Sequence, residues 1–138
     1  MKKTLLVPGV CLGIAVFAQK PDAPAAAKAA FAKAFPGMSK AVWEKEDGNY
    51  EVSFENDGKK MSLLYDAKGV LKESEVSIQV SGLPAAAITY MNQHYKGINI
   101  KGAAKITKPD GSIQYKAELK GKDILFDSPG KFIKEAKN

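Results

Sequence analysis

Paired carboxylates are the side chains of this 138-residue chain whose spacing could support catalysis. Glu73 and Glu75 are two residues apart, and Glu51 and Glu55 are four apart, so each pair would share one face of a β-strand. Two carboxyl groups enclosed by a cleft can act as a general acid and a general base, whereas on an open sheet they remain solvated. The spacing therefore predicts a shared face, and it keeps a carboxylate-dependent hydrolase as an alternative to a binding surface.

Other residues that carry catalysis or bind metals are scarce. His94 is the only histidine, and a role on the flank of a helix beside Tyr95 suits it better than catalysis or metal binding, which need partners. Asp57-Gly58, Asp66-Ala67-Lys68-Gly69 and Asp110-Gly111 lack the alternating acidic ligands of a calcium loop and predict hairpin turns. We therefore expect a protein that is not an enzyme and that uses no cofactor and no metal.

The amino terminus has the pattern of a signal peptide. Its first three residues include two lysines, an apolar stretch covers residues 5–17, and small side chains around Ala18 suit a signal peptidase. We expect residues 1–18 to be removed, which predicts a periplasmic or secreted protein without a membrane span. An uncleaved anchor is the alternative, but it needs about 18 uninterrupted apolar residues. Cys11, the only cysteine, would leave with the signal, so the mature chain would have no disulfide and no thiolate.

The charge is basic in sum but divided along the chain. The formal net charge is +6, and all 21 basic residues are lysine. Nucleic-acid readers use arginine for bidentate contacts, so the lack of arginine and the predicted export argue against nucleic acid. Residues 39–81 carry six lysines against nine acids, whereas residues 82–138 carry ten against five. The two halves therefore have opposite sign.

A repeat of about sixty residues organises the chain. Pro24-Ala25-Ala26-Ala27 and Pro84-Ala85-Ala86-Ala87 each open a helical pattern, which ends near Phe35 in the first copy and near Tyr95 in the second. Both patterns place apolar side chains on one stripe. We expect one domain over residues 19–138, built from two repeats at about 23–81 and 82–138.

Alternating side chains after each helix predict strands. Tyr50, Val52 and Phe54 alternate with polar residues, as in a half-buried strand. Turn residues separate four such segments in each repeat, and hairpin-linked strands pair antiparallel. The predicted strands are 40–46, 50–55, 60–66, 70–80, 98–108, 112–120, 123–127 and 131–135. The fold class is therefore α+β, with about eight antiparallel strands and both helices on one face.

The order of these motifs is similar to that of a known family. A helix ending at Phe35-Pro36-Gly37, then Val42-Trp43, Tyr50-Glu51-Val52-Ser53-Phe54, Tyr65-Asp66-Ala67-Lys68-Gly69 and Leu83-Pro84, resembles the PepSY-like proteins of bacterial envelopes. These are grouped by shape with the beta-lactamase inhibitor protein, whose tandem repeats form a curved sheet. The resemblance implies a small exported binding or inhibitory domain without catalysis. The lactamase inhibitor has a disulfide in each repeat, so the absence of cysteine from the mature chain leaves lactamase inhibition unsupported.

The sheet face away from the helices is the expected functional surface. By strand parity, Glu51, Glu55, Glu73 and Glu75 would point outward in the first repeat and Lys105 and Lys116 in the second. Trp43 and Leu64 are the candidate apolar anchors, although Trp43 would also fit the core. A monomer that binds an envelope or extracellular protein of reverse polarity is the main hypothesis. The alternative is a small ligand or envelope polymer bound between helices and sheet.

Overall fold

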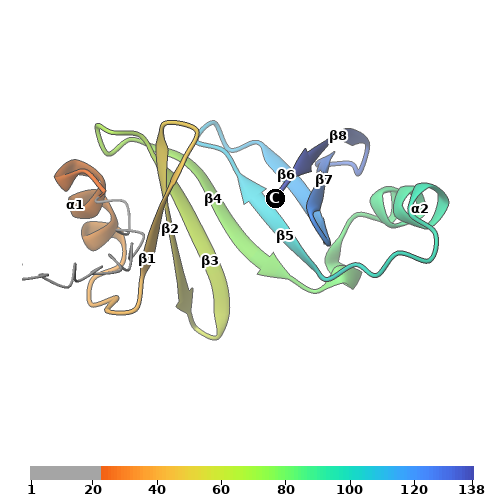
Figure 1. Ribbon diagram of the computed structural model, residues 1–138, viewed down its shortest axis with the longest axis horizontal. Helices are drawn as coiled ribbons and strands as arrows, with labels where there is room; N and C mark the ends of the chain where they lie inside the picture. Colours follow the sequence, from red (N-terminus) through yellow and green to blue (C-terminus); the bar gives the residue numbers. More distant parts are fainter. Residues whose placement is uncertain (1–22) are drawn as a thin grey trace, which may run out of the picture.

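The computed structural model describes residues 23–138, and the predicted signal peptide lies outside them. In chain order the elements are α1 (Ala25–Ala34), β1 (Val42–Glu46), β2 (Asn49–Asn56), β3 (Lys59–Tyr65), β4 (Leu71–Ile78), η1 (Val80–Gly82), α2 (Ala85–His94), β5 (Gly102–Thr107), β6 (Ile113–Leu119), β7 (Lys122–Asp127) and β8 (Phe132–Lys137). Within residues 23–138, the helices are all too short or too polar to cross a membrane. Figure 1 shows α1 and α2 near opposite ends of one long sheet.

The eight strands form a single antiparallel sheet in the order of the sequence, with β1 and β8 at its edges. The predicted α+β fold with two helices is confirmed. The strand expected to reach Val80 ends at Ile78, because the chain makes a single turn of 3-10 helix at Val80–Gly82. That turn delivers Leu83 into the core, where it is 4% exposed.

Both helices lie on the same face of the sheet. Residues that stand directly opposite in neighbouring strands share a face, and one such row runs from β2 to β7. It runs through Phe54, Met61, Val76, Lys105, Tyr115 and Phe126. Phe54 belongs to the core under α1, and Phe126 belongs to the core under α2. The helices therefore cover one face and leave the other free.

Each helix has its own hydrophobic core. Phe31 of α1 packs with Val52 and Leu63, whereas Met91 of α2 packs with Ile124 and Phe126. The two clusters of buried residues have no member in common. The repeats are therefore joined mainly by the β4–β5 ladder, which continues the sheet from one to the other.

The repeated sequence motifs meet in space. Gly69 has φ +80°, and a Cβ atom there would lie 2.6 Å from the Ala26 carbonyl oxygen in the first turn of α1. Gly130 has φ +102°, and its Cβ atom would lie 2.9 Å from the Ala87 nitrogen in α2. Only glycine accepts both the backbone conformation and the close approach. The Pro-Ala-Ala-Ala motif and the Asp-x-x-Gly turn are therefore the two halves of one contact, made once in each repeat.

Candidate functional site

The helix-free face of the sheet is concave and holds a groove. A cavity of about 380 Å³ is lined both by Glu46 and Asp47 of the β1–β2 hairpin and by Lys134 and Lys137 of β8. Residues from the two edge strands can line one cavity only if the sheet curves away from its helices, as Figure 1 shows. A second cavity of about 510 Å³ shares Glu51, Ser62, Glu75 and Lys116 with the first. The two cavities form a continuous groove, called here the concave groove.

Most of the residues predicted to face outward lie in this groove. Leu64 stands opposite Glu51 on one side and Glu73 on the other, so all three share the free face. The structure brings together Glu51, Leu64, Glu73, Glu75 and Lys116 around the first cavity and adds Glu55 in the second.

Two of the predicted residues lie on the other face. Lys105 stands opposite Val76 and Tyr115, so its predicted outward position is wrong. The β5–β6 register pairs Ala104, and not Lys105, with Lys116, and a change of one residue reverses the face.

Trp43 is also on the helix side. It stands opposite Val52, and its ring packs edge-on against Phe31 with ring centroids 5.8 Å apart. It also lies 6.1 Å from the ring of Tyr65. The interpretation of Trp43 as an outward anchor is therefore wrong, and its alternative role in the core is confirmed.

The groove uses equivalent positions of the two repeats with opposite charge. Tyr50 stands opposite Tyr65 in the first repeat as Tyr115 stands opposite Phe126 in the second, and this register fixes the equivalence. It matches Leu64 with Leu125, Glu51 with Lys116, and Glu73 with Lys134. All six line the same cavity. The first cavity thus has two leucines on its floor, with Glu51 and Glu73 on the side of the first repeat and Lys116 and Lys134 on the side of the second.

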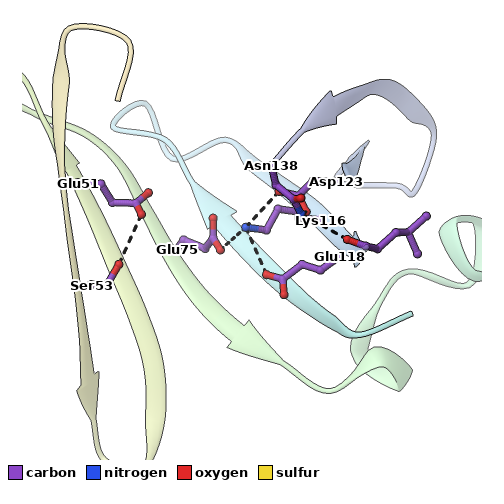
Figure 2. Close-up of polar contacts among 8 residues, drawn as sticks. Glu51, Ser53, Glu75, Lys116, Glu118, Asp123 and Asn138 are labelled. Carbon is purple, nitrogen blue, oxygen red and sulfur yellow. Dashed lines mark hydrogen bonds and ion pairs between the residues drawn. The ribbon is translucent and has the colours of Figure 1, made fainter. Parts of the chain in front are cut away.

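Lys116 is at the centre of the polar network. It stands opposite Ala104, whose small side chain lets the lysine cross β5 toward β4. Its Nζ atom lies 2.6 Å from Glu75, 3.4 Å from Glu118 and 3.9 Å from Asp123, as Figure 2 shows. Burial opposes its charge, but the carboxylates outweigh this effect and raise the pKa of Lys116. Burial raises the pKa of Glu75 even though Lys116 opposes the shift.

The ion pairs also cross the boundary between the repeats. Lys108, just after β5, contacts Glu73 of β4, and Lys116 of β6 contacts Glu75 of β4. Part of the charge division along the sequence is therefore balanced within the molecule. These pairs hold the inner strands of the two repeats together on the concave face.

Glu51 is a groove carboxyl group whose surroundings oppose its charge. Figure 2 shows it projecting from β2 on the same side as Glu75 and Lys116. Burial, together with the negative charges of Glu46 and Glu75, raises the pKa of Glu51 to about 7, although Lys116 opposes the shift. Ser53 donates a hydrogen bond of 3.5 Å to its Oε1 atom. Glu51 can therefore exchange a proton near neutral pH.

Several groove residues were not predicted from the sequence. Leu125 and Asp123 lie on its floor and side, and strand parity from Lys116 through the β6–β7 register would have found both. The place of Lys134 in the groove depends on the bulge between β7 and β8, which a single sequence does not show. Within residues 23–138, no group of three or more His, Cys, Asp or Glu could hold a metal ion.

The sequence matches one family model over nearly its whole length. Residues 19–73 and 72–134 each match the family described as "Putative beta-lactamase-inhibitor-like, PepSY-like". The chain belongs to the PepSY-like family. The resemblance drawn from the order of the motifs is thereby confirmed, and the PepSY-like model is matched twice, as a duplicated chain would be.

Solved structures share the fold of this PepSY-like chain at low sequence identity. A protein from Bacteroides eggerthii, described as putative periplasmic, has a TM-score of 0.70 and 14% identity, covering 83% of this chain and 88% of its own. A DUF2874 family protein from Bacteroides uniformis has a TM-score of 0.68 and 19% identity, with coverage of 83% and 89%. A BLIP-like protein from Bacteroides fragilis has a TM-score of 0.56 and 21% identity, with coverage of 81% and 84%. Among curated proteins, none matches the chain significantly.

Proposed function

We propose that this PepSY-like chain is an exported, non-enzymatic binding module that captures an envelope or extracellular protein in its concave groove. The observation that carries the proposal is that equivalent positions of the two repeats, with opposite charge, line one cavity together with Leu64 and Leu125. A partner with a basic and an acidic patch on either side of an apolar side chain complements this pattern. Such charge complementarity steers association and fixes register more than it adds affinity.

The periplasmic or secreted location and the monomeric state belong to the same proposal. The signal-like amino terminus and the neighbour described as periplasmic support export. The family description supports protein binding, because it likens these proteins to a protein inhibitor.

A second candidate function is the hydrolysis or binding of a small ligand or envelope polymer. It is favoured by Glu51, whose pKa of about 7 suits a general acid, near the carboxyl group of Glu75 in one cavity. Against it, Glu73 and Glu75 are each held by a lysine, so neither is an unengaged base. Replacement of Glu51 by Gln would abolish hydrolysis but leave capture of a protein largely intact.

The test of the main proposal is a change of charge in the groove. Residues 19–138 are immobilised and incubated with envelope extract from the bacterium that makes the protein, and captured proteins are identified by mass spectrometry. We expect Glu51→Lys with Glu73→Lys to lose the specific partner. Unchanged capture would exclude the groove.

A matched control adds the same four units of positive charge outside the groove. Ala29→Lys, Ala32→Lys, Asn92→Lys and Gln93→Lys change exposed positions on α1 and α2. We expect this variant to retain the partner. Equal loss in both variants would show that net charge, and not the groove, governs capture.

A further inference from the structure

The charged residues that line the concave groove are sorted by depth. Its half-buried lining contains five acidic residues and one lysine, Lys116, whereas the other four lysines that line it are all exposed. The five acids are Glu51, Glu73, Glu75, Glu118 and Asp123. The whole chain has a formal net charge of +6, so the interior of the groove has the opposite sign to the molecule that contains it.

The lysines of the chain only partly neutralise this interior. Lys116 is shared by three of the five carboxyl groups, and Lys108, just after β5, pairs with Glu73. Glu51 takes part in no ion pair within residues 23–138, and its dashed line in Figure 2 leads only to Ser53. The interior therefore keeps an excess of negative charge, which is strongest on the side of β2.

The strand pairing adds further negative charge beside Glu51. Glu44 of β1 stands directly opposite Glu51, and Glu46 lies two residues along β1 on the same face. Like charges directly opposite in neighbouring strands are destabilising. The charge of Glu46 contributes to the raised pKa of Glu51. A positive group bound between these carboxylates would remove the repulsion.

Apolar side chains lie beside this negative charge. Leu64, Ile106 and Leu125 line the first cavity together with Glu51. The cavity volume of about 380 Å³ is near the lower end of the range of about 300–1,000 Å³ that is typical of ligand pockets. A cavity of this size admits a few protruding side chains, whereas a flat protein surface could not fill it.

We propose that the concave groove receives a protruding basic segment of the partner protein, whose lysine or arginine side chains enter the acidic interior while an aliphatic side chain covers Leu64 and Leu125. This inference rests on the proposed function and specifies which part of the partner is recognised. A cleft lined by one sign of charge concentrates groups of the opposite sign. Lysine and arginine also have apolar stems, which can lie along the leucines while their charged ends reach the carboxylates.

Amide chemical shifts of isotope-labelled residues 19–138 test this inference above pH 7, where Glu51 is mostly ionised. The probe is N-acetyl-Lys-Leu-Lys-amide. We expect saturable shifts centred on Glu46, Glu51 and Leu64, smaller shifts with N-acetyl-Lys-Gly-Lys-amide, and no groove shifts with N-acetyl-Glu-Leu-Glu-amide. Equal shifts with either control peptide, or shifts centred outside the groove, would overturn it.

Two other occupants are outcomes of the same experiment. The same shifts produced by calcium chloride alone would assign the acidic interior to a metal ion. Groove shifts that depend on protein concentration without a probe would assign it to a second copy of the chain. Either outcome would overturn the inference.

Two matched double variants make the result specific. Glu46→Gln with Glu51→Gln should weaken binding of the probe about four- to twentyfold, since each exposed ion pair that is lost costs about two- to fivefold. Folding favours the protonated form of Glu51, so a neutral side chain there should not unfold the protein. Asp57→Asn with Asp110→Asn removes the same charge from exposed turns that line neither cavity, and it should change binding less than about twofold. Equal losses in both variants would show that net charge governs binding and would overturn the inference.

Capture from envelope extract separates this inference from the proposed function. Groove-dependent capture of a protein, without a preference for the basic tripeptide, would overturn the inference and leave the proposed function standing. Unchanged capture by Glu51→Lys with Glu73→Lys would overturn the proposed function and this inference with it.

Discussion

The two repeats share the contact between turn and helix, but they differ in where the large aromatic ring between helix and sheet comes from. It comes from a strand in the first repeat and from the helix in the second. In the first, the large ring is Trp43 on β1, where the second has Ala103. In the second, it is Tyr90 on α2, where the first has Ala30. Trp43 lies at the β1 edge of the sheet, and Tyr90 packs on Phe132 at the β8 edge.

The position of each repeat in the sheet explains this exchange. A free edge leaves the adjacent core open to water, so each repeat needs bulk on its outer side. The inner side of the second core is covered by Ile78 and Val80 from the connection between the repeats. The two repeats therefore keep the same backbone contacts, whereas the position of the large side chain in each depends on which side of its core is open to water.

The largest effect should come from a change that tests whether the two cores unfold together. Phe126 is fully buried, and Phe126→Ala should destabilise the protein by about 3–5 kcal/mol. Because the β4–β5 ladder joins the repeats, we expect the fluorescence of Trp43 and the far-ultraviolet circular dichroism to report one common, lowered midpoint in urea. If Trp43 kept its wild-type midpoint, the repeats would be independent folding units.

The contact between turn and helix is the next test, because both repeats make it. Gly69→Ala should cost about 2–4 kcal/mol, since it combines a positive φ with a clash against the Ala26 carbonyl. Gly58 has φ +74° with nothing within 4 Å of a Cβ atom, so Gly58→Ala should cost only about 1–2 kcal/mol. Urea denaturation measures both, and equal losses would show that the close approach to α1 is unimportant.

A smaller effect should appear in the pH dependence of stability that Glu51 causes. The pKa of Glu51 is raised from 4.5 to about 7, so the folded state favours its protonated form. Its stabilising contribution is complete below pH 4.5 and is lost as the pH rises through about 7. From pH 5 to 8 the wild type should therefore lose about 1–3 kcal/mol relative to Glu51→Gln, allowing for solvent screening.

Thermal unfolding at several pH values measures this difference. The comparison with Glu51→Gln cancels the contributions of the other acids that both proteins share. Parallel curves for the two proteins would contradict the raised pKa of Glu51.

The smallest effect concerns two lysines that differ in burial. Lys116→Met should cost about 1–2 kcal/mol, because it leaves the partly buried Glu75 without its ammonium partner while keeping the apolar stem. Lys122 pairs with Glu135 at 3.2 Å near the surface, with side chains 35% and 45% exposed. Lys122→Met should therefore cost less than about 1 kcal/mol. Urea denaturation at low salt measures both losses of stability. A greater loss for Lys122→Met would contradict the claim that the Lys116–Glu75 pair is the more stabilising of the two.

The sequence alone was sufficient for the elements, because local patterns determine them. The sixty-residue repeat located α1 and α2, and period-two alternation located all eight strands to within a few residues. The same alternation placed Glu51, Leu64, Glu73 and Glu75 on one face, because each lies in a strand whose parity is clear from its own neighbours.

The tertiary structure decided what depends on register and curvature. Lys105 was placed on the wrong face because parity does not carry across a turn unless the strand pairing is known. Trp43 could be assigned to the core only once β1 was seen opposite Val52 and under Phe31. Leu64 and Leu125 can line one cavity only because the whole sheet is curved, and the raised pKa of Glu51 depends on burial and on the neighbouring charges of Glu46 and Glu75. Such long-range contacts leave no local signal, because they depend on how distant strands twist and pair.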